Sequence, residues 1–453
     1  MHKAYKTDMK KILMLGAGLS ATSLIAYLLK HAESEDWKII LGDLDIELAK
    51  KKLNKHPRGE AIIFNICDLN SHLETFKNSN LVISMLPARF HQLVADTCLE
   101  YGKPMVTASY VSPDMLALDQ DVKDKGLLFL NELGVDPGID HMSAMRLIDE
   151  IKDKGGKLVS FKSHTGGLIA PEYDNNPWNY KFTWNPRNVV LAGQGTSMFI
   201  RNGRHKYIPY HKLFNRLEYT SIQDVGEFEI YPNRDSLKYR PTYDLCGIPT
   251  MVRGTMRRKG FCEAWDVFVQ LGLTDDSFMI EDSEYMTYRQ FVNSFLKYNP
   301  GIPVEEKMAK YTGIEVDGEI MRKIKWLGLF EDEPIGLVNA TPAMIMQKKL
   351  QEKWKLDPGD KDMIVMEHVI EWELDNKKYQ TRSSLVVRGK NQEETAMAIT
   401  VGTPVAIAAR LLLNGTITGS GVKIPIKPEL YNPILDELET LGIKFIDIVK
   451  EID

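Results

Sequence analysis

The chain has 453 residues, of which 43% are hydrophobic and 26% charged, a composition typical of a globular protein with two or three domains. Its net charge of −5, with no long run of Lys or Arg, argues against nucleic-acid binding. No apolar run approaches the roughly 18 residues of a membrane span. The polar start MHKAYKTDMKK lacks the apolar region of a signal peptide, so we expect a cytoplasmic protein with no membrane segment.

The four cysteines are scattered along the chain, without a CxxC pair or a nearby His. Such spacing predicts neither a zinc site nor a disulfide framework. We therefore expect no bound metal, and we interpret Cys67, Cys98, Cys246 and Cys262 as buried thiols.

The first predicted strand, Ile12 to Leu15, runs into the turn GAGLSA and then into an apolar helix. Gly16 permits the tight turn, Gly18 leaves room for phosphates, and Ala21 lets helix and strand pack closely. A strand, a glycine turn and a helix in this order present helix amides to the pyrophosphate of a dinucleotide. The alternative is that a lone GxGxxA sequence is only a turn.

Asp43 follows the second predicted strand, where the other half of this fingerprint is expected. An acidic side chain there accepts hydrogen bonds from the ribose hydroxyls of NAD and repels the extra phosphate of NADP. We therefore expect NAD, whereas Lys50 to Lys52 in the next helix leave NADP as an alternative. Asp43 or Asp45 could also cap that helix, Ile46 to Leu53.

Further alternating strands and helices with short connections complete a doubly wound sheet, the Rossmann type of α/β fold. Ligands bind at the carboxyl ends of such strands, so the loop Ser84 to Pro87 should lie beside the cofactor. The later predicted strands are Ala61 to Asn65, Leu81 to Pro87, Met105 to Tyr110 and Gly126 to Asn131.

Asp136 stands at a sharp turn made by Pro137 and Gly138, just before a predicted helix from Ile139 to Lys152. A buried carboxylate at this position could hold a substrate amine. Capping of the helix is an equally good explanation from spacing alone.

The segment from Lys157 to Thr255 is rich in predicted strands, namely Leu158 to His164, Val189 to Leu191, Ser197 to Arg201 and Phe228 to Tyr231. Between the first two lies Gly166 to Trp184, whose Gly, Pro, Asn and aromatic residues are typical of a binding loop. Any one of its aromatic residues, taken alone, is better explained by packing in the core. Taken together, these residues indicate a binding site.

Arg234 and Arg257 lie in short turn-like contexts, PNRDS and RGTMRR. Guanidinium groups bind carboxylates in bidentate fashion, so two such segments favour a small acid with several negative charges. Alternatively, Arg234 pairs with Asp235, and Arg257 belongs to a solvated run with Arg258 and Lys259. For Arg257, spacing alone favours the solvated alternative.

Apolar residues recur at helical spacing from Phe261 to about Met346, which predicts a helical insert. Strands return at Asp362 to Met366 and Ser384 to Arg388, and an apolar helix, Thr395 to Leu413, is expected to pack on the Rossmann sheet. We predict three domains: a Rossmann domain at 1–137 plus about 395–425, a mixed α/β domain at 138–255 plus 355–394 and 426–453, and a helical domain at 256–354.

Several long motifs in fixed order resemble those of the glutamate-forming saccharopine dehydrogenases, also called saccharopine reductases, nearly from end to end. They are the glycine turn, Thr107 to Tyr110, Glu132 to His141, Gly166 to Trp184, Pro232 to Ser236, Arg253 to Arg257, Lys361 to Met366, and Thr400 to Pro404.

This resemblance implies a Rossmann domain, a mixed α/β domain that binds saccharopine and forms homodimers, and a helical third domain. The implied reaction oxidises the secondary amine of saccharopine with a nicotinamide cofactor. Water then splits the imine into L-glutamate and 2-aminoadipate 6-semialdehyde, a step of lysine metabolism.

Matching motifs also assign site residues by resemblance. Asp136 and Tyr110 are the implied catalytic side chains. Substrate contacts fall on Ser109, Tyr110, Asp136, Arg234, Thr255, Met256 and Arg257. Cofactor contacts fall on Gly16, Ala17, Gly18, Leu19, Ser20, Asp43, Asn65, Met85, Thr107, Ala108, Gly134, Val135 and Thr183.

Two departures from the family pattern matter. His164-Thr165 stands where characterised members commonly have Tyr-Cys, so no catalytic thiol is expected there. Asp43-Leu44-Asp45 differs from the Arg-containing turn of NADP-dependent fungal members and resembles the acidic turn of NAD-dependent animal ones.

Two other functions remain alternatives. A carboxynorspermidine or homospermidine synthase of the same superfamily would need carboxylates rather than arginines for its polyamine, and Arg234 and Arg257 weigh against it. A non-catalytic NAD-binding interaction module is opposed by the presence of Asp136, Tyr110 and both arginines.

Overall fold

The computed structural model describes residues 9–453, which form two compact units. Within the described residues, the first unit comprises 9–154 with Gly389–Lys444, and the second comprises Gly155–Arg388 with Phe445–Asp453. The expectation of a cytoplasmic protein and the start of the predicted Rossmann domain draw partly on residues 1–8, which lie outside the described residues.

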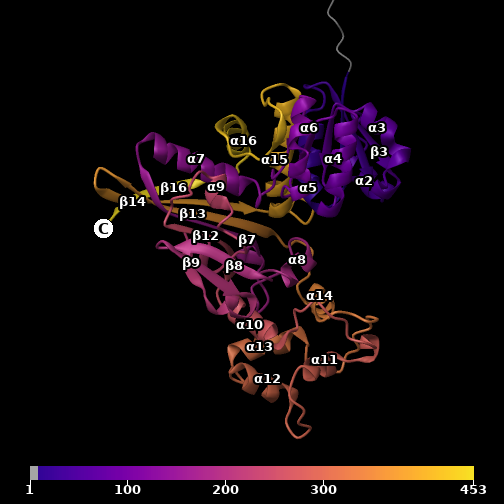
Figure 1. Cartoon of the computed structure of the whole chain (residues 1–453). Helices are drawn as coiled ribbons and strands as arrows, with labels where there is room; N and C mark the ends of the chain where they lie inside the picture. Colours follow the sequence, from indigo (N-terminus) through magenta and orange to yellow (C-terminus); the bar gives the residue numbers. More distant parts are fainter. Residues whose placement is uncertain (1–8) are drawn as a thin grey trace, which may run out of the picture. The chain divides into compact units, whose positions relative to one another are not determined.

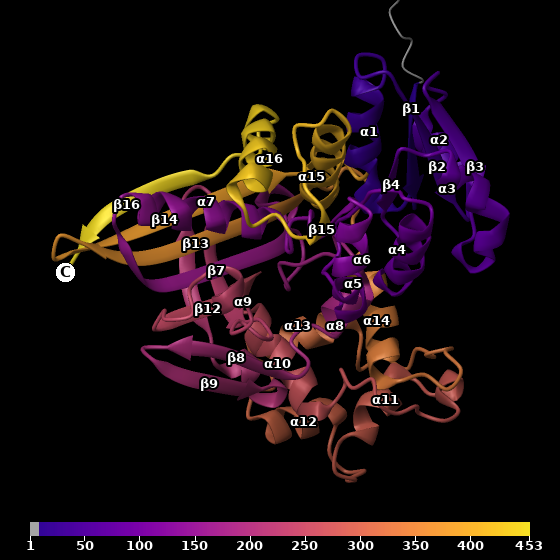
Figure 2. The same ribbon diagram turned by 45° about the horizontal axis from the view of Figure 1, so that its top comes forward.

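The first unit is built on a seven-stranded parallel sheet with the order β15-β6-β5-β4-β1-β2-β3. The order 3-2-1-4-5-6 is that of a Rossmann fold, which confirms the predicted fold class, and Figure 2 shows β1 to β4 side by side. The strands are β1 (Lys10–Leu15), β2 (Trp37–Asp43), β3 (Gly59–Ile63), β4 (Leu81–Ser84), β5 (Met105–Thr107), β6 (Leu128–Leu130) and β15 (Gly421–Lys423).

Helices of the first unit begin where the sequence supplies N-caps. Asp45 accepts two amides at the start of α2, Ser112 accepts one at α5, and Thr395 accepts one at α15. The helices are α1 (Thr22–His31), α2 (Ile46–Leu53), α3 (Leu73–Lys77), α4 (His91–Glu100), α5 (Pro113–Ala117), α6 (Asp119–Asp124), α7 (Ile139–Asp153), α15 (Ala396–Leu413) and α16 (Pro428–Thr440).

Helix α15 corrects one sequence-based statement. It is 18 residues long and apolar enough to cross a membrane by length and composition, although no apolar run of that length was recognised. Its apolar side chains are explained by packing, because 67% of the helix is buried within the structure. Gly402 lets it approach α1 closely: an added Cβ would lie 2.7 Å from Ser20 O and 2.9 Å from Leu24 N. Figure 2 shows α15, in yellow, beside indigo α1.

A polar cluster joins α1, α15 and α16. Arg410 of α15 donates to the Tyr27 hydroxyl at 2.8 Å and to Glu35 at 3.0 Å, and it also bonds to Glu437 of α16. Burial, followed by the Glu437 carboxylate, raises the pKa of Tyr27. The cluster therefore links α1 to helices that lie almost 400 residues later in the sequence.

The second unit is built on a nine-stranded mixed sheet, whose main path is β10-β11-β12-β7-β13-β14-β16. Only β12 and β7 run parallel along this path, and Figure 1 shows β13, β14 and the C-terminal β16 together. The strands are β7 (Lys157–Ile169), β8 (Thr196–Arg201), β9 (Arg204–Pro209), β10 (Glu218–Ile222), β11 (Gly226–Pro232), β12 (Thr250–Arg258), β13 (Asp362–Leu374), β14 (Lys377–Arg388) and β16 (Ile446–Ile452).

One predicted strand of this unit is wrong. Val189 and Val190 belong to helix α8 (Pro186–Val190), because Asn185 accepts the Arg187 amide as an N-cap and Pro186 occupies the first helical turn. A second short helix, α9 (Tyr239–Thr242), follows β11.

The segment after β12 is helical, as the sequence indicates, and it shares its core with the sheet of the second unit. Trp178, Phe261 and Trp354 pack in one apolar cluster with Val252 of β12 and Met346. The helices are α10 (Phe261–Leu271), α11 (Tyr288–Ser294), α12 (Val304–Thr312), α13 (Glu319–Leu327) and α14 (Pro342–Lys353).

The predicted three-domain boundaries remain a prediction, and the two units differ from them in places. The helical segment lies within the second unit, while α7 and most of 426–453 lie in the first. Two cysteines also differ from expectation: Cys98 and Cys262 are buried, but Cys67 and Cys246 are exposed.

Candidate functional site

The glycine turn after β1 has the geometry that a nucleotide loop needs. Gly16 has a φ of +101°, and an added Cβ would lie 2.9 Å from Met85 O, so only glycine fits. A Cβ on Gly18, in contrast, would meet nothing within 4 Å. The backbone at Gly18 therefore faces open space in front of the α1 N-terminus, where a pyrophosphate can approach.

Asp43 lies against this turn. Its Oδ2 accepts the Ala17 amide at 2.7 Å, and its Oδ1 accepts the Asp45 amide at 2.9 Å. Asp45, not Asp43, caps α2, since its Oδ1 accepts the amides of Glu47 and Leu48. Asp43 is thus left at the end of β2, in the position of a ribose ligand.

Two of the three lysines on α2 face partners away from this turn. Lys50 pairs with Glu47 and Lys51 pairs with Glu393, on the exposed side of the helix. Lys52 instead donates to the Thr22 hydroxyl in the first turn of α1, and burial lowers its pKa. Lys52 is therefore the lysine of α2 whose amine lies near the nucleotide loop.

All predicted cofactor residues except Thr183 lie at the carboxyl edge of the parallel sheet. Leu19 is exposed, whereas Ala17 and Thr107 are buried. At Gly134 an added Cβ would lie 3.0 Å from Pro137 O and 3.3 Å from Ala108 O, so the loops after β5 and β6 pack closely. The residues that follow each strand are Asn65 after β3, Met85 after β4, Thr107 and Ala108 at β5, and Gly134 and Val135 after β6.

Tyr110 and Asp136, the predicted catalytic pair, are brought together in the first unit. The Tyr110 hydroxyl donates to Asp136 Oδ1 at 2.9 Å. Tyr110 is 45% exposed, so this pair can be reached from solvent. A carboxylate that accepts from a phenol can relay a proton between the two groups.

Glu132 holds the loop that carries Ser109 and Tyr110. Its amide donates to Ser109 O at 3.0 Å, and its Oε1 accepts the Val111 amide at 3.0 Å. His141, which is fully buried, contacts the other carboxylate oxygen at 2.7 Å. Glu132 was not selected from the sequence, although it opens the motif Glu132 to His141.

His91, the first residue of α4, was also missed by sequence reasoning. Its Nδ1 lies 2.8 Å from Ser84 Oγ, and its Nε2 lies 2.7 Å from Ser109 Oγ. Burial lowers the pKa of His91 to about 4. In the sequence, its position directly after the loop at the end of β4 could have indicated that it lies near the site.

In the second unit, Arg257 is a buried cation whose cross-strand neighbour on β11 is the buried Glu229. It is 3% exposed and lies among three rings, with its guanidinium carbon 5.2 Å from the centroid of Tyr180 and 5.4 Å from that of Phe261. Its Nη1 donates to Met256 O at 2.9 Å, and its Nε has no hydrogen-bond partner. No salt bridge joins it to any carboxylate within 9–453. The solvated alternative for Arg257 is therefore wrong.

Thr255 and Arg257 lie on the same face of β12, because they are two residues apart in a strand. Tyr231 of β11 pairs with Thr255 in register and shares that face. Met256, a predicted substrate contact, points its side chain to the opposite face, where its Cβ lies 2.9 Å from a Cβ built on Gly166. Only the backbone of Met256 can contact a ligand on the face of β12 that carries Thr255 and Arg257.

Arg234 is exposed in the turn after β11, with a φ of +37°. Asp235 does not pair with it, since Asp235 Oδ1 accepts the amides of Leu237 and Lys238. Thr183 is buried in the second unit, and its hydroxyl has no hydrogen-bond partner. Both side chains therefore retain polar atoms for a ligand.

The aromatic residues of the predicted binding loop serve mainly as packing. Trp178, Tyr180 and Phe182 are buried in the apolar cluster of the second unit, and Trp184 is partly buried against it. His164, at the departure from the family pattern, is buried on β7 with its Nδ1 4.0 Å from Glu367.

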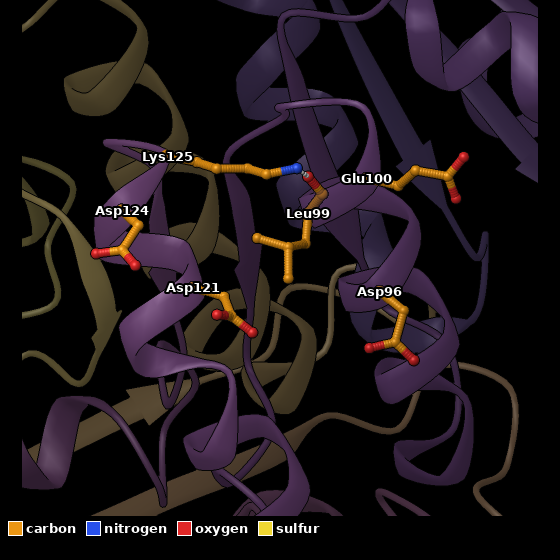
Figure 3. A pocket seen from close by; sticks show the side chains of 6 residues that line it. All are labelled: Asp96, Leu99, Glu100, Asp121, Asp124 and Lys125. Carbon is orange, nitrogen blue, oxygen red and sulfur yellow. Dashed lines mark hydrogen bonds between the residues drawn. The ribbon is translucent and has the colours of Figure 1, made fainter.

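A surface depression between α4 and α6 is separate from these features. Figure 3 shows Lys125 donating to Leu99 O, at 2.7 Å, among four carboxylates. It lies near the C-terminal ends of both helices, hence toward the amino edge of the parallel sheet, whereas ligands bind at the carboxyl edge. Among residues 9–453, no group of three or more His, Cys, Asp or Glu side chains is placed to hold a metal ion.

Comparison with known proteins gives matches along nearly the whole chain. Residues 12–130 match the family model "Saccharopine dehydrogenase NADP binding domain", and residues 134–443 match "Saccharopine dehydrogenase C-terminal domain". The chain is 31% identical to a saccharopine dehydrogenase [NADP(+), L-glutamate-forming] of Schizosaccharomyces pombe, over 96% of this chain and 98% of that protein.

Two further matches differ in extent. The chain is 35% identical to the mitochondrial alpha-aminoadipic semialdehyde synthase of Bos taurus, over 96% of this chain but only 47% of that longer protein. A solved structure of apo saccharopine dehydrogenase (L-Glu forming) from Saccharomyces cerevisiae superposes with a TM-score of 0.88 at 30% identity, covering 97% of this chain and all of that one.

Proposed function

We propose a function on the premise that the chain belongs to the saccharopine dehydrogenase family, which both family models and the full-length relatives show. The protein is an L-glutamate-forming saccharopine dehydrogenase, an oxidoreductase of lysine metabolism. It oxidises the secondary amine of saccharopine, and water then divides the imine into L-glutamate and 2-aminoadipate 6-semialdehyde.

The observation that carries this proposal is the buried guanidinium of Arg257. Arg257 makes no salt bridge within 9–453, because its buried cross-strand neighbour Glu229 accepts the amides of Gly260 and Cys262 instead. An incoming carboxylate would supply the charge-assisted contact that the guanidinium lacks. Saccharopine has three carboxylates, whereas a polyamine brings further positive charge. Arg257, with Nε unpaired beside Thr255 and Tyr231, therefore favours the acid over the polyamine of the alternative function.

The residues of the first unit suit a dinucleotide and a proton transfer. When bound, the nicotinamide supplies the hydride acceptor. Gly16 and Gly18 shape the phosphate loop, and Asp43 stands at the ribose position. The Tyr110 hydroxyl donates to Asp136 Oδ1 at 2.9 Å, so the Asp136 carboxylate is placed to take the proton of the secondary amine and to activate the attacking water.

A more specific proposal is that the enzyme prefers NAD to NADP, and it rests on Asp43. The S. pombe relative carries NADP(+) in its name, yet a carboxylate at the end of β2 repels a 2′-phosphate. We expect a higher kcat/KM with NAD than with NADP, and Asp43→Ala should narrow the difference. Asp45→Ala is the matched control, because it removes only the α2 cap. Equal or better kcat/KM with NADP in the wild type would overturn this preference.

A homodimer in the cytoplasm completes the proposal. The dimer is drawn from the family resemblance and the location from composition. Sedimentation velocity of the full chain at micromolar concentration measures the first, and a single monomeric species would contradict it.

Steady-state kinetics test the enzymatic function against its alternatives. Oxidation of saccharopine is followed by the near-ultraviolet absorbance of the reduced cofactor, and carboxynorspermidine is assayed in parallel. The proposal predicts turnover of saccharopine and none of the polyamine. Preference for the polyamine would favour the sister enzymes. Cofactor binding without turnover of either compound would favour the interaction module.

A further inference from the structure

The imidazole of His91 connects a fully buried serine to a serine of the proposed site. Ser84, at the end of β4, is 0% exposed, and its hydroxyl lies 2.8 Å from His91 Nδ1. His91 is 6% exposed, and its Nε2 lies 2.7 Å from the hydroxyl of Ser109, which is half-buried in the loop after β5. Ser109 directly precedes Tyr110, whose hydroxyl donates to Asp136.

A neutral imidazole has one donor nitrogen and one acceptor nitrogen, so its two neighbours must behave differently. Burial keeps His91 neutral near pH 7, since it lowers the pKa to about 4. If Nδ1 donated to Ser84, the Ser84 proton would be left buried without an acceptor. An unsatisfied buried donor is rarer than an unsatisfied acceptor. The Ser84 hydroxyl therefore donates to Nδ1, and the proton of the ring lies on Nε2.

This tautomer fixes the direction of the Ser109 hydroxyl. Because Nε2–H donates to Ser109 Oγ, the Ser109 proton cannot point at the imidazole and must point to another acceptor. A carboxylate is an acceptor only, so it binds a serine that offers its proton. The opposite tautomer would present the lone pairs of Ser109 to the ligand and repel a carboxylate.

We propose that His91 is a positioning residue for substrate: through Nε2–H it holds Ser109 with its hydroxyl proton directed at a substrate carboxylate. The inference rests on the proposed function, because it takes saccharopine as the ligand of Ser109. It adds a residue that never contacts the substrate itself, and it gives Ser84 the role of fixing the tautomer.

Kinetics of two variants test the effect on binding. His91→Leu removes both hydrogen bonds and should raise KM for saccharopine about tenfold or more, the loss of one charge-assisted hydrogen bond, with a smaller change in kcat. His91→Gln should restore most of the affinity, because its amide can accept from Ser84 and donate to Ser109. The Kd for the cofactor, measured by fluorescence of its reduced form, should stay within about twofold of wild type in both variants.

A double-mutant cycle separates positioning from general damage. In a Ser109→Ala background, His91→Leu should leave KM unchanged, since no hydroxyl remains to be oriented. Effects on KM that multiply independently in the double variant would overturn the proposal, and so would a His91→Gln variant as impaired as His91→Leu.

Nitrogen-15 NMR of the wild-type enzyme determines the tautomer of His91 directly, without an activity assay. With the signal identified by its loss in His91→Gln, we expect a protonated Nε2 and an unprotonated Nδ1 at pH 7. The reverse tautomer, or a doubly protonated ring, would overturn the proposal. Failure of the proposed function is seen separately, as absence of saccharopine turnover by wild-type enzyme.

Discussion

Arg257 sets the charge of the predicted substrate-binding residues of the second unit, and its environment gives a direct mutational prediction. A lysine cannot reproduce a bidentate guanidinium contact. Arg257→Lys should raise KM for saccharopine and lower kcat/KM about ten- to a hundredfold, or roughly 1.5–3 kcal/mol. Arg234→Lys should act in the same direction, since its side chain is exposed and not bonded to Asp235.

Arg258→Lys provides the matched control for Arg257. Arg258 is the next residue of β12, but it faces the other side and donates to Val225 O at 2.8 Å. Its replacement should leave KM near the wild-type value. Wild-type kinetics in Arg257→Lys and Arg234→Lys would show that the acid is anchored elsewhere, and would reopen the polyamine alternative.

The pair of Tyr110 and Asp136 leads to a prediction about the chemical step. Asp136→Asn keeps the size of the side chain but removes its ability to accept a proton. Since general acid–base groups are typically worth about 10² to 10⁴ in rate, kcat should fall within this range while cofactor affinity is kept. Rapid-mixing measurement of the hydride step checks this, and an unchanged rate would remove Asp136 from the mechanism.

At this scale the sequence predicted some roles and missed others for physical reasons. The glycine turn and Asp43 could be found because their chemistry depends on local order in the chain. Burial of Arg257 could not be found, because a neighbouring Arg and Lys look solvated until the sheet forms. His91 and Glu132 act through loops distant in sequence, so no spacing rule reveals them.

The polar contacts that join α1, α15 and α16 depend on Arg410. Removal of this guanidinium leaves Glu437 and Glu35 partly buried without their counter-charge. Arg410→Met should lower the free energy of unfolding of the first unit by about 1.5–3 kcal/mol, the usual range for hydrogen bonds to charged groups. Urea unfolding followed by circular dichroism measures the change.

Arg388→Met is the matched control for Arg410→Met, because it removes an arginine from a surface ion pair. Arg388 pairs with Glu172, and both side chains are about half exposed, so the change should cost less than about 1 kcal/mol. If both variants lost the same stability, the cluster around Arg410 would have no special role in joining the helices.

Elements with a strong local pattern were predicted, and those defined by long-range pairing were not. The alternating strands and helices of the Rossmann sheet follow from hydrophobic runs and short connections. Strand β15 joins the same sheet from residue 421 onward, and β9 and β10 are short and exposed, so their pairing partners decide their structure. At α8 an Asn cap and a proline outweighed β-branched valines.

Stability of the whole molecule should respond to acid through His91. The folded protein protonates this group near pH 4 and the unfolded chain near 6.5, so the unfolded state binds more protons between these values. The stabilising contribution is complete above pH 6.5 and is lost as the pH falls towards 4, a change of about 3 kcal/mol.

The difference between wild type and His91→Gln isolates this contribution, because the carboxylates and the remaining histidines titrate alike in both proteins. Thermal unfolding between pH 4 and 7 should show a steeper loss of stability in the wild type. Parallel curves would mean that His91 is not held neutral in the folded protein.

The sequence predicted three domains, and those boundaries remain a prediction beside the two compact units of the structure. The sequence could not show that the helical segment and the mixed sheet share one apolar cluster, because Trp178 and Trp354 are far apart in the chain. The family resemblance, resting on motifs in fixed order, was confirmed by the full-length matches.

Product analysis decides between glutamate-forming oxidation and any other outcome. Purified enzyme is incubated with saccharopine and NAD or NADP, and amino acids are quantified by mass spectrometry alongside the reduced cofactor. We predict one L-glutamate and one 2-aminoadipate 6-semialdehyde for each cofactor reduced. Release of lysine and 2-oxoglutarate, or no product with either cofactor, would contradict the proposed function.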